Sequence, residues 1–186
     1  MKNRIFTSLL LVSATVFSTF GLIKPSVAQS PTQGIRYTCT DWNYQGEMVP
    51  TTIADTPRGR IAMIVWKSDF FSGSGWTPAR RCQSVTRRLQ EFHNALSYYN
   101  KDFILGLGTI NQQPVICAMK RQQGDQKVCY NNGALITLEP SDNALAVFQS
   151  LVEVASYSGS EPLVRGVDDV VNVEEWLSNG TPIDDE

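Results

Sequence analysis

The sequence predicts an α+β protein, a single compact domain in which an antiparallel sheet of about five strands is packed by two helices and held by two disulfides. Short apolar or alternating segments with the period of β-strands recur between residues 35 and 138. Two further segments, one starting at Pro78 and one following Pro140, have the apolar spacing of amphipathic helices. The cysteines are even in number, which is typical of disulfides in an oxidising compartment: Cys39, Cys82, Cys117 and Cys129.

The chain divides into segments of different character. Residues 1–28 have the basic start, apolar run and small-residue ending of a cleaved signal peptide, with an uncleaved membrane anchor as the alternative. Residues 29–34 are expected to be disordered, residues 35–157 to form the domain, and residues 158–186 to form a tail with a short helix. Three of the 16 Lys and Arg lie in residues 1–28 and none of the 18 Asp and Glu, so the remaining net charge is 13 − 18 = −5, which argues against nucleic-acid binding.

Strands are expected where the apolar pattern alternates or runs unbroken. In residues 35–40, alternation places Ile35, Tyr37 and Cys39 on the buried face. The Gly, Pro, Asp and Thr content of residues 41–60 predicts a loop. The other expected strands are 61–66, 103–110, 114–119, 127–130 and 134–138, with "NQQ" and "NNG" as turns. Gly106 and Gly108 mark a bulge or a close approach of another group.

The helices are predicted from their caps and apolar faces. Thr77 suits the N-cap and Pro78 the first position of a helix whose buried stripe is Cys82, Val85, Leu89, Phe92, Leu96 and Tyr99. Ser141 or Asp142 is expected to cap a second helix, which covers the same sheet with Leu145, Phe148, Leu151, Val152 and Ala155. Asn172 and Glu175 have capping-box spacing in the tail.

No motif for catalysis is present. The glycines of "SGSGWTPARR" are followed by Trp76 and a proline where a phosphate-binding loop needs Lys and Ser or Thr. His93 is the only histidine and is interpreted as a structural residue, and no metal or cofactor is expected. A non-enzymatic role is therefore favoured over a hydrolase or redox enzyme whose site assembles only in three dimensions. An exposed Cys82, separate from Cys39 and beside His93 or a carboxylate, would favour the enzyme.

Aromatic and arginine side chains around "TPRGR" and "WKSDFFSGSGWTPARR" form the candidate binding surface: Arg58, Arg60, Trp66, Phe70, Phe71, Trp76, Arg80 and Arg81. The expected partner is an unknown, membrane-bound protein or an anionic ligand, with peripheral membrane association. The alternative is that the rings cap the core and that the arginines form a solvated face. An arginine docking surface predicts binding that weakens with salt.

Several segments together resemble the cyanobacterial circadian oscillating protein family: "TPRGR", "SGSGWTPARRCQSVTRRLQEF", "GLGTINQQPVIC" and "VCYNNGALITLEP". The resemblance runs from about Tyr37 to Leu151, and its most specific element is Thr-Pro-x-Arg-Arg-Cys at residues 77–82. It implies an exported or membrane-associated protein with the same four-cysteine framework, in the periplasm or the thylakoid lumen, and it supplies no catalytic residues. The polar connection "CAMKRQQGDQKVC" departs from the family pattern.

The positions of the cysteines predict their pairing. Spacing alone permits three connectivities. Cys117 and Cys129 flank the connection between two strands of one hairpin, where cross-strand side chains come within disulfide distance. Cys39 and Cys82 then remain, and both face the core by their own periodicities. The second bond would join the long helix to the sheet.

Overall fold

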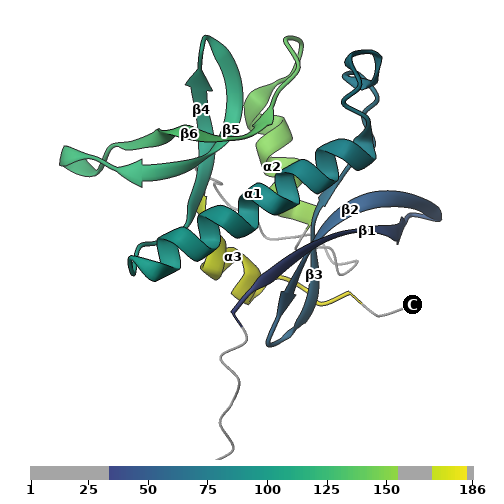
Figure 1. Cartoon of the computed structure of the whole chain (residues 1–186), viewed down its shortest axis with the longest axis horizontal. Helices are drawn as coiled ribbons and strands as arrows, with labels where there is room; N and C mark the ends of the chain where they lie inside the picture. The colour runs from purple at the N-terminus through teal and green to yellow at the C-terminus, as the bar shows by residue number, and fades with distance from the viewer. Residues whose placement is uncertain (1–33, 155–168, 184–186) are drawn as a thin grey trace, which may run out of the picture. The chain divides into compact units, whose positions relative to one another are not determined.

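The computed structural model describes residues 34–154 and 169–183, so the predicted signal peptide lies outside the described residues. The α+β class is confirmed, but the strands form two antiparallel sheets instead of one sheet of about five strands. The first sheet has the order β1-β2-β3 and the second the order β6-β5-β4-β7. In the view of Figure 1, α1 crosses the picture between the labels of the two sheets, and it contacts strands of both. The chain forms the first sheet entirely before α1 and the second entirely after it, which separates the two sets of strands.

The first sheet consists of β1 (Arg36–Tyr44), β2 (Glu47–Thr56) and β3 (Gly59–Val65). The predicted loop over residues 41–60 is wrong, because most of it is β2 and the end of β1. Gln45 and Gly46 both have positive φ, 55° and 84°, which is the backbone of a two-residue hairpin turn. Threonine is β-branched and suits a strand, and the central threonines of β2 are fully buried.

Helix α1 spans Pro78–Tyr98 and confirms the predicted start, since the Thr77 side chain accepts a hydrogen bond from the Arg80 N–H. Its buried residues follow the expected stripe from Cys82 to Leu96, except that Phe92 is only half-buried and His93 beside it is buried. The stripe does not reach Tyr99, which is 67% exposed because the helix has already ended. The helix packs against β1, β2 and β6, so it contacts both sheets.

The second sheet consists of β4 (Ile104–Ile110), β5 (Gln113–Arg121), β6 (Lys127–Thr137) and β7 (Val170–Asn172). Asn111 and Gln112 have φ of 52° and 62° and form the predicted turn at "NQQ". The turn predicted at "NNG" is wrong, because β6 continues through it with an irregular register against β5. Gly133 permits this, since a Cβ there would lie 2.6 Å from the Ala118 carbonyl oxygen.

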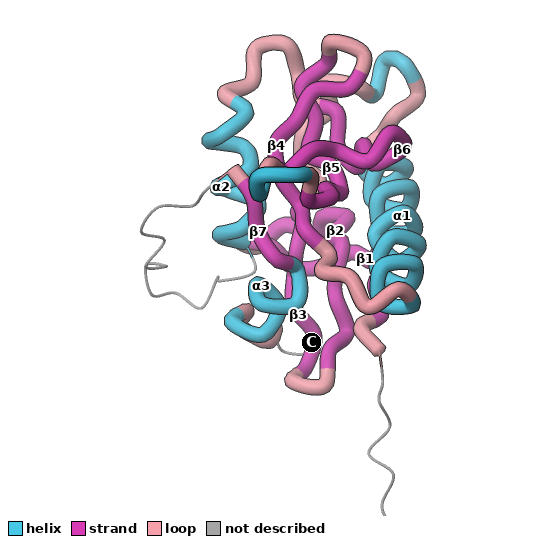
Figure 2. Tube along the Cα trace, turned by 90° about the vertical axis from the view of Figure 1, so that its left-hand side faces the viewer, coloured by secondary structure: helices cyan, strands magenta, loops and turns pink. Residues whose placement is uncertain are grey.

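Helix α2 spans Ala144–Val154 and starts later than expected. The Ala146 N–H donates to the Asn143 side chain, so Asn143 caps the helix in place of Ser141 or Asp142. Leu145, expected on the buried face, is 44% exposed, whereas Phe148, Leu151 and Val152 are buried as expected. Figure 2 shows α1 and α2 on opposite sides of the strands, and α2 packs against β3, β4 and β5. The sequence predicts that α2 covers the same sheet as α1. In the structure, α2 contacts strands of both sheets, as α1 does.

Helix α3 (Val173–Asn179) follows β7 and has the predicted cap, with the Asn172 side chain accepting from the Glu175 N–H. Val173 is fully buried, and the Trp176 indole N–H donates to the Val152 carbonyl oxygen at 3.0 Å. A single apolar cluster joins residues of both sheets and all three α-helices. The final described segment is thus part of the core.

Both predicted disulfides are present, Cys39–Cys82 and Cys117–Cys129. The first joins β1 to the first turn of α1. The second joins β5 to β6 on the outer face of the second sheet, within a smaller apolar cluster around Ile104. A Cβ on Gly108 would overlap this bond, which confirms the close approach expected at that glycine.

Candidate binding site

The candidate site forms where the loop after β3 enters α1. The loop contains a short 3-10 helix, η1 (Ser72–Ser74), and is closed by a backbone hydrogen bond from the Trp76 N–H to the Phe71 carbonyl oxygen at 3.1 Å. Thr77 and Pro78 then begin α1, which places Arg81 in the first helical turn. This turn lies beside Trp66, at the end of β3.

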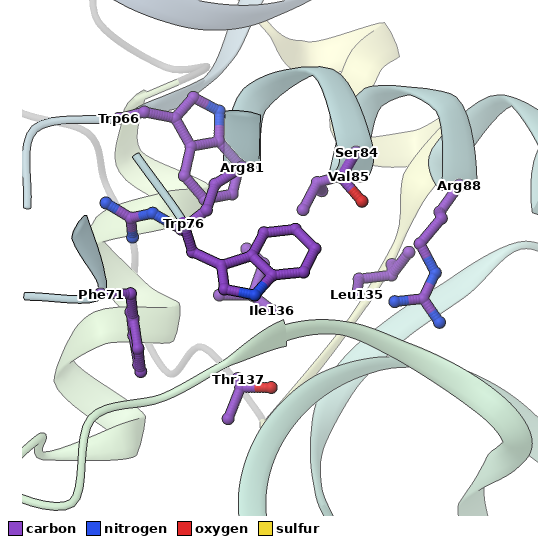
Figure 3. A pocket seen from close by; sticks show the side chains of 10 residues that line it. All are labelled: Trp66, Phe71, Trp76, Arg81, Ser84, Val85, Arg88, Leu135, Ile136 and Thr137. Atoms are coloured by element: carbon purple, nitrogen blue, oxygen red, sulfur yellow. The ribbon is translucent and has the colours of Figure 1, made fainter. Parts of the chain in front are cut away.

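A pocket of about 310 Å³ opens at this position (Figure 3). In Figure 3 the guanidinium groups of Arg81 and Arg88 lie on either side of the Trp76 ring, with side chains of β6 next to them. The pocket is lined by Trp66, Phe71, Trp76, Arg81, Ser84, Val85, Arg88, Leu135, Ile136 and Thr137. Among the residues that the structure describes, the charged ones that line this pocket are the two arginines.

A second pocket of about 400 Å³ continues the first toward α2. The two share Trp66, Phe71, Arg81, Ile136 and Thr137 as lining residues, so together they form one groove, here called the Arg81 groove. The second part also contains Lys67 and the acidic side chains Glu139 and Asp142. The groove is therefore basic at the α1 end and carries charges of both signs toward α2.

Arg81 is held by aromatic rings. Its guanidinium carbon lies 5.5 Å from the centroid of the Trp66 ring and 5.8 Å from that of Phe71, both within cation–π range. Nη2 donates to the Ser68 carbonyl oxygen, whereas Nε is buried and has no hydrogen-bond partner among the described residues. Burial lowers the pKa of Arg81, and the charges of Glu139 and Asp69 oppose this shift.

The two other arginines at this end bind main-chain oxygens. Arg80 Nη1 donates to the Gly75 carbonyl oxygen at 3.2 Å, and its guanidinium lies 5.1 Å from the Trp76 ring centroid. Arg88 Nη2 donates to the Asn132 carbonyl oxygen at 3.3 Å. Each guanidinium has five N–H groups, so these bonds leave donors for a ligand.

Trp66 forms a fixed wall of the groove. Its indole N–H donates to Thr52 Oγ1 at 3.0 Å, and Thr52 Oγ1 shares a hydrogen bond of 2.9 Å with Thr86 Oγ1. All three side chains are buried. Hydrogen bonds to Thr52 of β2, which in turn bonds to Thr86 of α1, thus fix the orientation of the indole ring.

The structure brings together only part of the surface predicted from the sequence. Trp66, Phe71, Trp76 and Arg81 line one pocket, Arg80 stacks on Trp76, and Phe70 is exposed and lies edge-on to Phe71, with 4.9 Å between ring centroids.

Arg58 and Arg60 lie elsewhere. Arg58 donates to the Ser178 carbonyl oxygen and Arg60 pairs with Asp55 at 3.5 Å. Strand β3 separates Arg60 from Trp66 by six residues, about 20 Å of extended chain.

Sequence reasoning did not place the α1 residues beyond Arg81, or any residue of β6, in one pocket with the aromatic rings. Arg81, Val85 and Arg88 recur at helical spacing, so one face of α1 could have been proposed from the sequence. The β6 residues carry no such signal, because their neighbourhood to α1 depends on tertiary structure.

The other chemistry-bearing groups lie inside the fold. Cys82 is fully buried and bonded to Cys39, so it is no free nucleophile. His93 is buried, and its Nδ1 shares a hydrogen bond of 2.9 Å with the Tyr37 hydroxyl. Burial lowers the pKa of His93 and raises that of Tyr37, and the nearby Glu174 charge raises both. Within residues 34–154 and 169–183, no group of three or more His, Cys, Asp and Glu could hold a metal ion.

The fold and the groove together define a disulfide-linked α+β domain with an aromatic and arginine-lined groove. The chain belongs to the circadian oscillating protein COP23 family, whose family model matches residues 36–178. Comparison with curated proteins and with solved structures gives no match. None of the helices in the described part of the chain is long and apolar enough to cross a membrane.

Proposed function

We propose that this protein is a non-enzymatic binding protein and that the Arg81 groove holds an anionic group attached to an apolar or aromatic body. The observation that carries the proposal is the environment of Arg81. Its guanidinium lies between the rings of Trp66 and Phe71, and its buried Nε–H has no hydrogen-bond acceptor among the described residues. A buried donor without a partner costs about 1–3 kcal/mol. An anion bound at Arg81 would satisfy it once a side chain that covers Nε moves, because Nε itself is buried in the structure.

The remaining lining supports the same class of ligand. Trp66 and Phe71 offer ring surface, and Trp76, which is 45% exposed, offers a face that a ligand can cover. Arg88 provides a second cation across the Trp76 ring. A sulfonate, carboxylate or phosphate joined to an aromatic or aliphatic group complements both features.

The test uses 8-anilinonaphthalene-1-sulfonate, whose fluorescence rises on binding, and N-phenyl-1-naphthylamine, the same ring system without the sulfonate. We expect the anionic dye to bind the native protein and Arg88→Gln to weaken it about tenfold, as loss of a charge-assisted hydrogen bond predicts. The neutral dye should be unaffected. Arg87→Gln is the matched control, since Arg87 is exposed on the same helix and is no lining residue of the pocket. Equal affinity of the Arg88→Gln and Arg87→Gln variants for the anionic dye would contradict the proposal.

The proposal includes export and association with a membrane-bound partner through the same groove. Support comes from the signal-peptide pattern of residues 1–28 and from two disulfides, which are typical of oxidising compartments. Replacing Arg80 and Arg81 with Gln should release the protein from membrane fractions, and raised salt should do the same, because screening shortens to about 8 Å at physiological ionic strength. Retention of the variant at all salt concentrations would contradict this part.

A further inference from the structure

The Arg81 groove runs beside the edge of a β-sheet. Leu135, Ile136 and Thr137 are consecutive residues of β6, and all three line the first pocket. Successive side chains of a strand point to opposite faces, so a cavity that touches three in a row lies beside the strand. β6 is the outer strand of the second sheet, and this is its free side.

The hydrogen-bond pattern shows which backbone groups face the groove. The Leu138 N–H donates to the Pro114 carbonyl oxygen at 3.0 Å, and Thr137 is in register with Val115. In an antiparallel pair, hydrogen-bonded and non-hydrogen-bonded positions alternate. Thr137 is therefore a non-hydrogen-bonded position, and its N–H and C=O point away from β5. No described residue forms a hydrogen bond with either group.

Helix α1 packs against β6, but the end of this edge at Thr137, which is exposed, lacks the usual protection against added strands. Arg88 covers the Asn132 carbonyl oxygen near the middle of β6. Residues 134–137, Ala-Leu-Ile-Thr, contain no charge and no proline, the two features that commonly block strand addition at a sheet edge. The open stretch is the one that borders the groove.

We propose that an extended peptide segment pairs with β6 at Thr137 as an added strand, and that it carries an acidic side chain against the arginines and an apolar one against Trp76. Side chains two residues apart on a strand share a face, so one segment can present both groups to the pocket. The acidic residue complements Arg81 and Arg88, the charged side chains among the described residues that line this pocket. The inference rests on the proposed function and names its ligand class.

The experiment begins with a random peptide library displayed on phage and selected on the folded, disulfide-intact protein. We expect enrichment of segments in which Asp or Glu lies two residues from an aromatic or aliphatic residue. One selected peptide is then synthesised and its affinity measured by isothermal titration calorimetry. Thr137→Pro removes only the outward N–H, so it should leave the β5 pairing intact and weaken the peptide at least tenfold. Thr137→Val keeps the N–H and should bind as the wild type does.

A second measurement leaves the protein unchanged. In an added strand, alternate peptide amides face β6, so N-methylation of one alternate set should abolish binding and methylation of the other set should not. Equal effects of both sets, or unaltered affinity for a folded Thr137→Pro variant, would overturn the inference. Sensitivity to Val65→Pro alone would overturn it too, because Val65 is the corresponding outward position on the edge of β3.

Failure here is distinguishable from failure of the proposed function. If the anionic dye depends on Arg88 but the library yields no acidic segment sensitive to Thr137→Pro, the pocket binds anions and strand addition is wrong. If selected peptides bind at Thr137 but Arg88→Gln does not change the affinity for the anionic dye, the edge is a binding site and the anionic-ligand proposal is wrong.

Discussion

Gly108 lies against the Cys117–Cys129 disulfide, and alanine at this position is expected to destabilise the oxidised protein. A Cβ there would overlap the Cys129 sulfur and lie 3.3 Å from the Cys117 sulfur. The sulfurs are covalently joined and Cys117 is fully buried, so neither can rotate away as a free side chain would. Overpacking of this kind costs about 1–3 kcal/mol, and we expect a loss of about 2 kcal/mol from the free energy of unfolding.

Removing the disulfide should abolish this penalty. In a Cys117→Ala/Cys129→Ala background, the nearest remaining contact of the new methyl group is Met119 Cε at 3.8 Å, an ordinary van der Waals distance. The φ of Gly108 is not positive, so alanine adds no backbone strain. Gly108→Ala should then be neutral or stabilising by about 0.4–1 kcal/mol through the unfolded state. The coupling between the two sites is therefore at least about 2 kcal/mol.

Equilibrium urea unfolding of the four proteins of this double-mutant cycle, without reductant, measures the coupling. Gly106→Ala is the control, since its added Cβ would lie 2.7 Å from the Asp169 carbonyl oxygen and 2.7 Å from Val170 Cγ1, and it should be destabilising in both backgrounds. A coupling for Gly108 below about 0.5 kcal/mol would refute the reasoning, because it would show that the disulfide is not what the methyl group meets.

Three further predictions concern stability. In the chain-entropy model, the disulfide from β1 to α1, with 43 residues of separation, contributes about 4 kcal/mol, and the one from β5 to β6, with 12, about 3 kcal/mol. Urea unfolding of the two Cys→Ala double variants should rank them in that order, and the reverse ranking would contradict the model. Because burial lowers the pKa of His93, the unfolded chain binds the proton more tightly, so stability is complete above pH ~6.5 and falls as pH drops from there through the folded pKa. Unfolding at several pH values should show this slope in the wild type and a shallower one in His93→Gln; equal slopes would exclude His93 as its source. Thr77→Ala removes the acceptor for the Arg80 N–H and should cost about 1 kcal/mol by urea unfolding, whereas Thr77→Asp should retain the stability; an unaffected Ala variant would show that the cap contributes nothing.

The parts of the fold that depend on local signals were predictable from the sequence. The start of α1 follows from Thr77 and Pro78, and its buried face from apolar spacing. β2 was missed because Pro50 and a run of threonines are usually read as loop. Two features make this segment a strand: the two-residue turn at Gln45 and Gly46, and the burial of side chains on both faces of β2. The second feature cannot be predicted from local sequence, because burial depends on the assembled protein.

The part of the candidate site that comes from one short segment of the chain was also predictable from the sequence. Trp66, Phe71, Trp76 and Arg81 are close in sequence, and the loop that joins them brings them together. Arg58 and Arg60 are equally close in sequence, but an extended strand carries them to the other end of the first sheet. Residues that are close in sequence stay close in space when a tight loop joins them, but an extended strand separates them. No local sequence pattern indicates that β6 closes the pocket.

The pairing of β7 with β4 also determines when folding can finish. Val170, Val171 and Asn172 are in register with residues 104–106, about 65 positions earlier, and α3 then supplies buried residues to the shared core. Such distant contacts raise the contact order and slow folding, because a long loop must close before they form. During synthesis, the second sheet lacks β7, one of its two edge strands, until residue 172 has emerged. Over that interval β4 is an unpaired edge, which is open to pairing with another chain until β7 has emerged.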